Sequence, residues 1–405
     1  MGQEYFERTL SDILRKATET FPVVLITGPR QVGKTTVFEK NKEEGRTYVT
    51  LDDPQIRSLA KSDPNLFLQS YKTPLLIDEV QYAPELFPYI KMIVDREKKK
   101  GMFWLTGSQQ FHLMQNVSES LAGRVVILEL QGLSQSEKQR RLSIEPFLPN
   151  NILSNGFCAM DVTDVYDNIL KGSYPELFAI PQVDRSMFYA SYLKTYIERD
   201  IRELINVADE HSFVKFVRVA AARTGQLLNY SDMARDVDVS VNTIKSWISI
   251  LETSGLVYML YPYHNNITNR VVKTPKMYFI DTGLCCYLSG WESVTALSNG
   301  AMSGAILETY VVSEILKSYW HNGKQARFYF YRDKEKREID LLIERDNVFY
   351  PIEIKRTASP KPGDVKHFAL LSKLGLSVGM GAIVCLYDGL LPLNESVNII
   401  PIGCL

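Results

Sequence analysis

The sequence predicts an α/β fold in which a parallel sheet is covered by helices on both faces, followed by a second α/β unit near the C-terminus. The first observation is an alternation of short apolar runs with helical stretches, the runs lying at residues 23–27, 48–51, 75–78, 103–106 and 125–130. Such alternation is typical of parallel strands joined by crossover helices. The second observation is a pair of strand-like runs, at residues 337–344 and 348–355, that a short turn separates.

Size and composition set the limits for function. The 405 residues are enough for two or three domains, and 45% hydrophobic with 23% charged residues is ordinary for a globular protein. The formal net charge of −1 means that a nucleic acid would have to be bound by local basic patches. The five cysteines show no metal-ligand spacing, and the sequence contains neither an export signal nor a run of 18 apolar residues. We therefore expect a cytoplasmic protein that makes no membrane contact.

The first element of the chain is expected to be a helix within residues 1–20, with Leu10, Ile13, Leu14 and Ala17 on one face. The first apolar strand follows it and runs into a glycine-rich loop, Gly28-Pro-Arg-Gln-Val-Gly-Lys-Thr-Thr36. Its pattern is that of a phosphate-binding P-loop (Walker A motif), and a helix can continue from it. The expected ATP-binding residues are Gly28, Pro29, Arg30, Gln31, Val32, Gly33, Lys34, Thr35 and Thr36.

Each conserved type of residue in such a loop has a chemical task. The glycines allow backbone N–H groups to surround phosphate oxygens at the positive end of the helix. Lys34 would reach the β- and γ-phosphates of ATP, and the Thr35 hydroxyl would bind Mg²⁺. A glycine-rich turn that matches the pattern by chance is the alternative, so the second half of the site matters.

That second half follows the third apolar run, which ends in the adjacent carboxylates Asp78 and Glu79. Asp78 would hold Mg²⁺ through water, and Glu79 would polarise the attacking water. The fourth run ends in hydroxyl groups, which suggests Thr106 or Ser108 as a sensor of the γ-phosphate, and Ser108 is the prediction. Arg124, just before the fifth run, is a candidate arginine finger in the same or a neighbouring subunit, with a surface arginine as the alternative.

The middle of the chain is expected to be helical. Residues 132–205 are interpreted as a helical lid or linker whose aromatic residues serve packing. Residues 206–290 have the order of a winged helix-turn-helix. On its third helix Val241, Ile244, Ile248 and Leu251 form one apolar stripe, and the opposite face carries polar residues suited to DNA contacts, namely Asn242, Thr243, Lys245 and Ser246. Winged helices also bind proteins, and a single lysine is a small basic footprint, so both interpretations stay open.

The C-terminal runs carry a second group of charged residues. If the turn centres on residues 346 and 347, opposed residues have numbers that sum to 693, which places Asp340 directly across from Glu353. Lys355 then shares the face of Glu353 because side chains alternate along a strand. Two carboxylates facing each other destabilise a sheet unless a cation compensates, and a divalent metal is the natural one.

The spacing Asp340-x₁₂-Glu353-x-Lys355 resembles the PD-(D/E)XK nuclease core. The resemblance implies Mg²⁺ or Mn²⁺ bound by Glu308, Asp340 and Glu353, with Lys355 orienting the water that attacks a phosphodiester. The proline of the motif is replaced by Ile339. Three interpretations stay open at this point: an exposed charged hairpin, a nuclease-like fold that no longer cuts, and an active nuclease.

The motifs also occur in a family order. The chain contains Leu-Asp-Asp-Pro, Leu-Ile-Asp-Glu-Val-Gln, Leu-Thr-Gly-Ser, Leu-Ala-Gly-Arg, Gly-Ser-Tyr-Pro-Glu, Tyr-Ile-Glu-Arg-Asp and Phe-Ile-Asp-Thr-Gly after the P-loop. It resembles a prokaryotic family that joins an AAA-type P-loop ATPase to a C-terminal domain of unknown function. The resemblance implies a P-loop ATPase domain at 1–131, a lid at 132–205, a winged helix at 206–290 and a nuclease-like α/β domain at 291–405.

These observations lead to two functional hypotheses. The first is a Mg²⁺-dependent ATPase whose nucleotide state controls how the C-terminal half engages DNA, with DNA cleavage as an open part of this hypothesis. The second is an NTPase switch that holds a protein partner through an inactive nuclease-like domain. Catalytic roles are expected for Lys34, Glu79, Ser108, Arg124, Asp340, Glu353 and Lys355, metal binding for Thr35, Asp78, Glu308, Asp340 and Glu353, and the oligomeric state stays open.

Overall fold

The N-terminal lobe is built on a parallel sheet. The computed structural model describes residues 4–107, 117, 119–143, 145–151, 160–197, 210–264 and 274–405. Five parallel strands pair in the order β2-β3-β4-β1-β5, and their bounds are β1 Val23–Thr27, β2 Thr47–Thr50, β3 Leu75–Asp78, β4 Phe103–Gly107 and β5 Val125–Glu129. The predicted parallel sheet is thus confirmed, with strand ends shifted by a residue at most.

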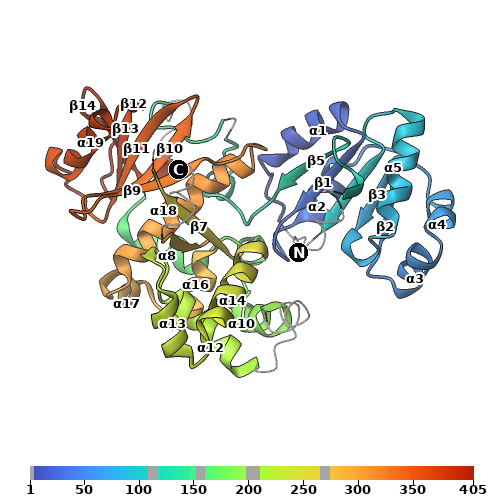
Figure 1. Ribbon diagram of the computed structural model, residues 1–405, viewed down its shortest axis with the longest axis horizontal. Helices are drawn as coiled ribbons and strands as arrows, with labels where there is room; N and C mark the ends of the chain where they lie inside the picture. The colour runs from blue at the N-terminus through green and yellow to red at the C-terminus, as the bar shows by residue number, and fades with distance from the viewer. Residues whose placement is uncertain are drawn as a thin grey trace.

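Helices cover both faces of this sheet (Figure 1). One face packs against α1 (Leu10–Thr20) and α2 (Lys34–Asn41), and the other against α3 (Pro54–Ser62), α4 (Pro64–Ser70) and α5 (Leu86–Glu97). The apolar pattern explains the two layers, because alternate residues of β1 enter different clusters: Val24 and Ile26 join the first, and Val23 and Leu25 the second. A 3-10 turn, Val80–Tyr82, follows β3 directly.

The segment between the lobes is helical where the structure describes it, as expected. It contains α7 (Gln135–Lys138), α8 (Val162–Lys171), α9 (Glu176–Ala179), α10 (Arg185–Tyr192) and the π-helical turn Leu193–Ile197. α7 begins at a capping box in which the Ser134 hydroxyl accepts the N–H of Glu137 and the Glu137 carboxylate accepts the N–H of Ser134. Aromatic residues of α10 pack into the core, as the sequence suggested.

The next segment contains the three helices and two strands expected from the sequence, together with a short strand, β6, that was not predicted. It comprises α12 (Glu210–Ala221), β6 (Gln226–Leu227), α13 (Tyr230–Val237), α14 (Val241–Thr253), β7 (Val257–Pro262) and β8 (Lys276–Phe279). Ile244, Ile248 and Leu251 are buried on α14 as predicted, but Val241 is 36% exposed. Val241 was wrongly placed because it is the first residue of the helix, beyond the contact with α12 and α13; Trp247 completes the buried stripe instead.

The other half of the molecule contains a ten-stranded sheet with helices packed around it (Figure 1). Its main path is β14-β15-β13-β11-β10-β9-β7-β8-β6, and β12 pairs with β11. Besides β6, β7 and β8, the sheet contains β9 (Phe328–Arg332), β10 (Glu338–Arg345), β11 (Val348–Lys355), β12 (Ser377–Val378), β13 (Gly381–Cys385), β14 (Leu391–Asn394) and β15 (Val397–Pro401). Parallel pairing of β7 with β9 carries the sheet across the expected boundary at residue 291.

The helices of the C-terminal half flank this sheet. They are α16 (Thr282–Leu288), α17 (Val294–Asn299), α18 (Ser303–Trp320), α19 (Ala369–Lys373) and the 3-10 turns Pro362–Phe368 and Ile402–Cys404. α18 is the longest of them, and most of its side chains are buried because it packs between the sheet and the segment after β5. The described residues contain no helix long and apolar enough to span a bilayer.

The hairpin register is the one predicted from the turn. Leu341 pairs with Ile352 and Arg345 with Val348, so the opposed numbers sum to 693. Asp346 and Asn347 occupy the turn with φ of 54° and 61°, as a type I′ turn requires. The short polar side chains at these two positions tolerate the left-handed conformation, which explains why the turn centres there.

Candidate functional site

The glycine-rich loop connects β1 to α2 and has the shape of a P-loop. Gly28 has φ of 147°, and a Cβ atom there would lie 1.9 Å from the Leu130 carbonyl oxygen. Gly33, with φ of 92°, directly precedes α2. Any larger residue at position 28 would push the loop away from the segment after β5. The glycines are therefore required by close backbone approach and by a left-handed turn, as the motif predicts.

Lys34 is folded back onto the loop it belongs to. Its Nζ donates to the carbonyl oxygens of Gly28 at 3.0 Å and Pro29 at 2.8 Å. Burial lowers the pKa of Lys34 to about 8, and the nearby Glu79 and Asp78 carboxylates oppose that shift. The amine thus still carries its charge at neutral pH. Since carbonyl oxygens are weaker partners than phosphate oxygens, the ammonium is poised to exchange one for the other.

Asp78 lies at the carboxyl end of β3 and collects three hydroxyl groups. Its Oδ1 accepts from Thr35 Oγ1 at 2.8 Å and from Thr106 Oγ1, and its Oδ2 accepts from Tyr48 OH at 3.2 Å. Tyr48 comes from β2 and Thr106 from β4, the two neighbours of β3, and Thr35 comes from the first turn of α2. A hydroxyl and a carboxylate side by side, next to the loop, are the oxygen ligands that Mg²⁺ takes in a nucleotide site. The residues present therefore fit MgATP.

Glu79 follows Asp78 in a left-handed conformation, with φ of 56° and ψ of 48°. This turn points the chain away from the strand, and the Glu79 N–H donates to Thr106 Oγ1 at 2.9 Å. The Glu79 carboxylate accepts a hydrogen bond from Gln81. Thr106 thus orients both acidic residues. It was the alternative to Ser108 as the sensor, and Ser108 itself lies outside the described residues.

Arg124 does not reach this site within its own chain. It immediately precedes β5, whereas the P-loop follows the carboxyl end of β1, which is parallel to β5. The length of a five-residue strand, about 16 Å, separates the two edges. Arg124 instead pairs with Asp95, with Nε–Oδ1 of 2.5 Å and Nη2–Oδ2 of 2.9 Å. The direction of β5 therefore contradicts the prediction that Arg124 acts as an arginine finger in its own chain. A role in a neighbouring subunit stays a prediction.

A cavity of about 460 Å³ opens on the outer side of the P-loop. Gln31 and Val32 of the loop, Thr36 and Val37 of α2, and Pro175 before α9 are among its lining residues. Its position beyond the phosphate-binding residues, at the start of α2, gives room for the nucleoside part of ATP. The segment around Tyr5 closes the cavity on the N-terminal side.

A buried charged group links the P-loop to the C-terminal half. Arg8 donates from Nη1 to the Val32 carbonyl at 2.9 Å and from Nη2 to the Gln131 carbonyl at 2.7 Å, and its Nε lies 3.1 Å from Glu137 Oε2. Nδ1 of His321, at the end of α18, lies 3.2 Å from Glu137 Oε1. The pKa of Glu137 is far below its usual range: burial raises it, but Arg8 and His321 outweigh the burial. Burial also lowers the pKa of His321.

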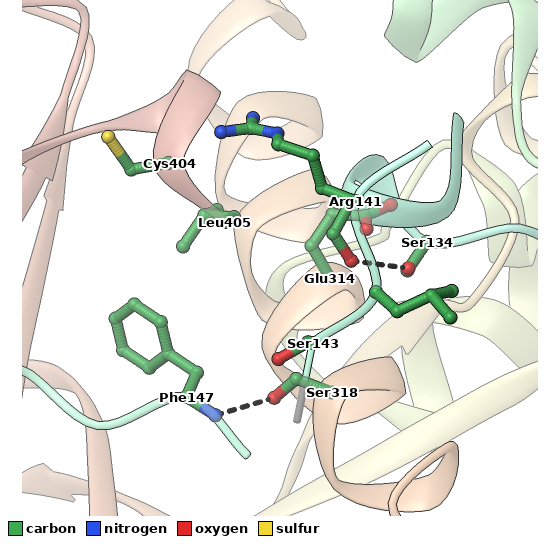
Figure 2. A pocket seen from close by; sticks show the side chains of 10 residues that line it. Ser134, Arg141, Ser143, Phe147, Glu314, Ser318, Cys404 and Leu405 are labelled. Atoms are coloured by element: carbon green, nitrogen blue, oxygen red, sulfur yellow. Dashed lines mark hydrogen bonds between the residues drawn. The ribbon is translucent and has the colours of Figure 1, made fainter. Parts of the chain in front are cut away.

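The contact between the segment after β5 and α18 continues beyond this group. The Gln135 N–H donates to Glu314 Oε2 at 2.6 Å, and Lys317 Nζ pairs with Glu314 Oε1 at 2.8 Å. Figure 2 shows the next part of this junction, where the Phe147 N–H donates to Ser318 Oγ at 3.0 Å beside a small cavity of about 30 Å³. α18 is thus anchored along several turns to the segment that follows β5.

The C-terminal hairpin gathers the charged residues predicted from its register. Asp340 and Glu353 are 9% and 6% exposed, which excludes an exposed charged hairpin. Asp340 sits at a β-bulge of β10 against β9, and its Oδ2 accepts the Ile354 N–H at 2.9 Å. Lys355 pairs with Glu353 and lies 4.0 Å from Asp340 Oδ2. Burial, together with Glu308 and Glu353, raises the pKa of Asp340 well above its usual range.

Glu308, the third predicted metal ligand, has other partners. Lys276 of β8 places Nζ 2.9 Å from Glu308 Oε1 and 2.6 Å from Glu338 Oε1, and Tyr278 OH donates to Glu308 at 2.6 Å. Among the residues that the structure describes, no three acidic, histidine or cysteine side chains are placed to hold a metal ion. The expected second Mg²⁺ or Mn²⁺ is thus not supported, because a lysine and a phenol already take up Glu308.

Comparison with known proteins identifies relatives along almost the whole chain. Over 390 residues it is 30% identical to uncharacterized protein Rv2008c of Mycobacterium tuberculosis and to uncharacterized protein Mb2031c of Mycobacterium bovis, covering 96% of this chain and 82% of each relative. The chain belongs to their family. In this family member, residues 20–138 match an AAA domain, and residues 162–295 and 303–405 match two domains of unknown function, DUF8612 and DUF4143.

The AAA match spans the P-loop, Asp78 and Glu79, and it supports ATP binding and hydrolysis by the N-terminal lobe. Among solved structures, the Walker-type ATPase of Pyrococcus abyssi aligns with a TM-score of 0.44 at 15% identity, covering 70% of this chain and 96% of that chain.

Several residues of these sites were not predicted. Tyr48 contacts Asp78 from the neighbouring strand, Arg8 and Glu137 meet across more than a hundred residues, and Lys276 reaches Glu308 from another segment. One sequence signal existed for Lys276, since a lysine in the apolar strand Lys-Met-Tyr-Phe requires a buried partner. For Arg8 and Glu137 the local sequence gives no such signal.

Proposed function

We propose that this protein is a Mg²⁺-dependent ATPase whose nucleotide state controls how its C-terminal half engages DNA. The observation that carries the ATPase part is the group formed by Lys34, Thr35 and Asp78 beside the P-loop. Bound Mg²⁺ would neutralise phosphate charge there, held by Thr35 directly and by Asp78 through water. The C-terminal half would bind DNA without cutting it, because Glu308 is held by Lys276 and Tyr278.

The residues of the nucleotide site divide the work as follows. Lys34 leaves the loop carbonyls and pairs with the β- and γ-phosphates. Glu79 orients and polarises the attacking water, because Thr106 fixes its N–H and its carboxylate lies near the Lys34 ammonium. Thr106, which contacts both acidic residues, relays the presence of the γ-phosphate to them. The nucleoside lies in the cavity beside Thr36 and Val37.

Engagement of DNA is supported by the exposed face of α14. Asn242, Lys245 and Ser246 are exposed there, while Ile244 and Trp247 hold the opposite face in the core. Further exposed basic residues lie near the hairpin, namely Lys324, Arg327, Lys334, Lys336, Arg337 and Arg356. Because α18 joins the nucleotide-binding lobe to this half, closure around the γ-phosphate would shift the balance between two arrangements of the C-terminal half.

Two measurements on the full chain test the proposal. Phosphate release from MgATP should be abolished in Lys34→Ala. Anisotropy of a labelled DNA duplex should show a Kd that a non-hydrolysable ATP analogue changes by at least about fivefold, the lower end of ordinary coupling between sites. The affinity should also fall steeply with salt.

Matched variants locate the contact. Lys245→Ala on α14 should weaken DNA binding at low salt, whereas Lys61→Ala, which removes an exposed lysine from α3, should leave the Kd unchanged. Wild-type ATP turnover in Lys34→Ala would refute the nucleotide site. A protein that hydrolyses ATP but binds no DNA, or binds it equally with and without the analogue, would refute the coupling.

A protein partner for the C-terminal half is the second candidate. The observation that favours it is the small basic footprint of α14, where Lys245 is the only cation on the exposed face, in a chain of net charge −1. In that case ATP turnover would be indifferent to DNA and would change on addition of the partner. Measuring turnover with and without duplex DNA separates the two candidates.

A further inference from the structure

A buried lysine lies among the carboxylates of the C-terminal half. Lys276 is 4% exposed, and its Nζ lies 2.9 Å from Glu308 Oε1 and 2.6 Å from Glu338 Oε1. The two carboxylates come from different elements, α18 and the start of β10, so one ammonium joins helix and sheet. Burying a lysine charge is costly unless ion pairs compensate it, and here two such pairs do so.

The other carboxylates of the cluster also have donors. Glu308 accepts a second hydrogen bond from Tyr278 OH, Asp340 accepts the Ile354 N–H, and Glu353 pairs with Lys355. A divalent ion bound by Glu308, Asp340 and Glu353 would have to displace these donors and leave the Lys276 ammonium next to a like charge. The arrangement therefore satisfies the carboxylates from within the chain.

We propose that the Lys276 ammonium takes the place of a divalent metal in this cluster, so that the C-terminal half works without one. The geometric basis is that Lys276 bridges Glu308 and Glu338 directly, while Tyr278 OH donates to the same Glu308 oxygen. The cluster joins β8, α18 and the hairpin, and it is a fixed ionic junction. The inference stands independently of ATP hydrolysis, because no residue of the nucleotide site takes part.

The proposal makes a second statement about the same residues. Without Lys276, the four carboxylates of Glu308, Glu338, Asp340 and Glu353 would keep two close cations, Lys355 beside Glu353 and Asp340, and Arg332, whose Nη1 lies 3.2 Å from Glu338 Oε2. Like charges at such separations disfavour ionisation of each other, so the cluster would take up a cation from solution. Removal of the lysine is thus expected to let these carboxylates draw together around a metal ion, although they are not placed to hold one in the wild-type protein.

The test is Mn²⁺ binding by the full chain without nucleotide, measured by electron paramagnetic resonance as free against bound ion. Wild type and Asp340→Asn should bind the same number of Mn²⁺ ions per chain, since the hairpin carboxylates contribute no site. Lys276→Met, which keeps the length of the side chain, should bind one additional ion. The double variant Lys276→Met/Asp340→Asn should lose that ion again.

Circular dichroism and ATP turnover report whether Lys276→Met is folded, and Lys276→Gln serves as a second variant if it is not. The wild-type comparison needs no substitution at position 276. A Mn²⁺ ion that wild type binds and that both Asp340→Asn and Glu353→Gln lose would overturn the proposal. No additional ion in either folded Lys276 variant would overturn the role given to the lysine.

Discussion

Replacing Glu137 by glutamine should destabilise the protein, because the buried charge of the Arg8 guanidinium would lose its ion-pair partner. Glu137 and Arg8 have side chains that are 0% and 3% exposed, and the carboxylate also accepts the N–H groups of Thr9 and Ser134, each at 2.9 Å. Glutamine keeps the shape of the side chain but removes the negative charge. The Arg8 guanidinium would then stay buried with only carbonyl oxygens as partners.

The expected magnitude follows from that uncompensated charge. Removing one partner of a buried ion pair costs about 3–5 kcal/mol. The loss here should lie in this range, because Arg8 is fixed by Val32 and Gln131 and cannot turn towards solvent. Glu145, an exposed residue eight positions on, offers a matched control, and Glu145→Gln should change the unfolding free energy by less than about 0.5 kcal/mol.

Urea unfolding followed by circular dichroism between pH 3 and pH 8 is the assay. The pKa of Glu137 is depressed in the folded protein, so its stabilisation is fully present above the unfolded value near 4.5 and is lost as pH falls below it. The gap between wild type and Glu137→Gln should therefore be constant above about pH 5 and shrink in acid. A gap below about 1 kcal/mol at pH 7, or one that grows in acid, would contradict the reasoning.

Three further results are expected. Gly28→Ala should abolish ATP binding and lower the unfolding free energy by at least about 2 kcal/mol, since the alanine Cβ would lie 1.9 Å from the Leu130 carbonyl oxygen. Thermal unfolding measured by calorimetry with and without ATP checks both effects. The Kd for ATP should rise by up to about tenfold per pH unit above pH 8, because the pKa of Lys34 is about 8 and only the ammonium form pairs with phosphate. Titration with a fluorescent ATP analogue measures this Kd, and a Kd that stays constant up to about pH 9.5 would contradict the prediction. Thr106→Val should lower kcat about tenfold, which corresponds to roughly 1.4 kcal/mol in the activation free energy, with KM little changed, because the Thr106 hydroxyl orients Asp78 and Glu79. An unchanged rate of phosphate release would contradict this role of Thr106.

The sequence predicted those parts of the molecule that local rules determine. The strands of the N-terminal sheet were predicted from the apolar runs. The P-loop was predicted from the spacing of its glycines, because few loop conformations require glycine at both of these positions. The register of β10 and β11 followed from the turn, because Asp346 and Asn347 accept the left-handed conformation and fix every pair behind them. Convergence of Asp340, Glu353 and Lys355 was a consequence of that register.

What could not be predicted depends on contacts between distant segments. Val241 fits a helical stripe, but its burial depends on how far α12 and α13 extend along α14. Arg124 lies near an apolar run, yet only the direction of β5 shows that it points away from the nucleotide site. Arg8, Glu137 and Lys276 meet their partners through tertiary packing, and neither spacing nor periodicity encodes such a meeting.

The parallel pairing of β7 with β9 determines whether the chain can be cut between residues 295 and 303 without loss of folding. Two separately described regions, residues 162–295 and 303–405, contribute neighbouring strands to one sheet. A product that began at residue 303 would leave the backbone N–H and C=O groups along one side of β9 without the strand they bond to, an edge prone to self-association. Recombination or truncation between these regions should therefore yield insoluble protein, and the two are expected to be inherited together.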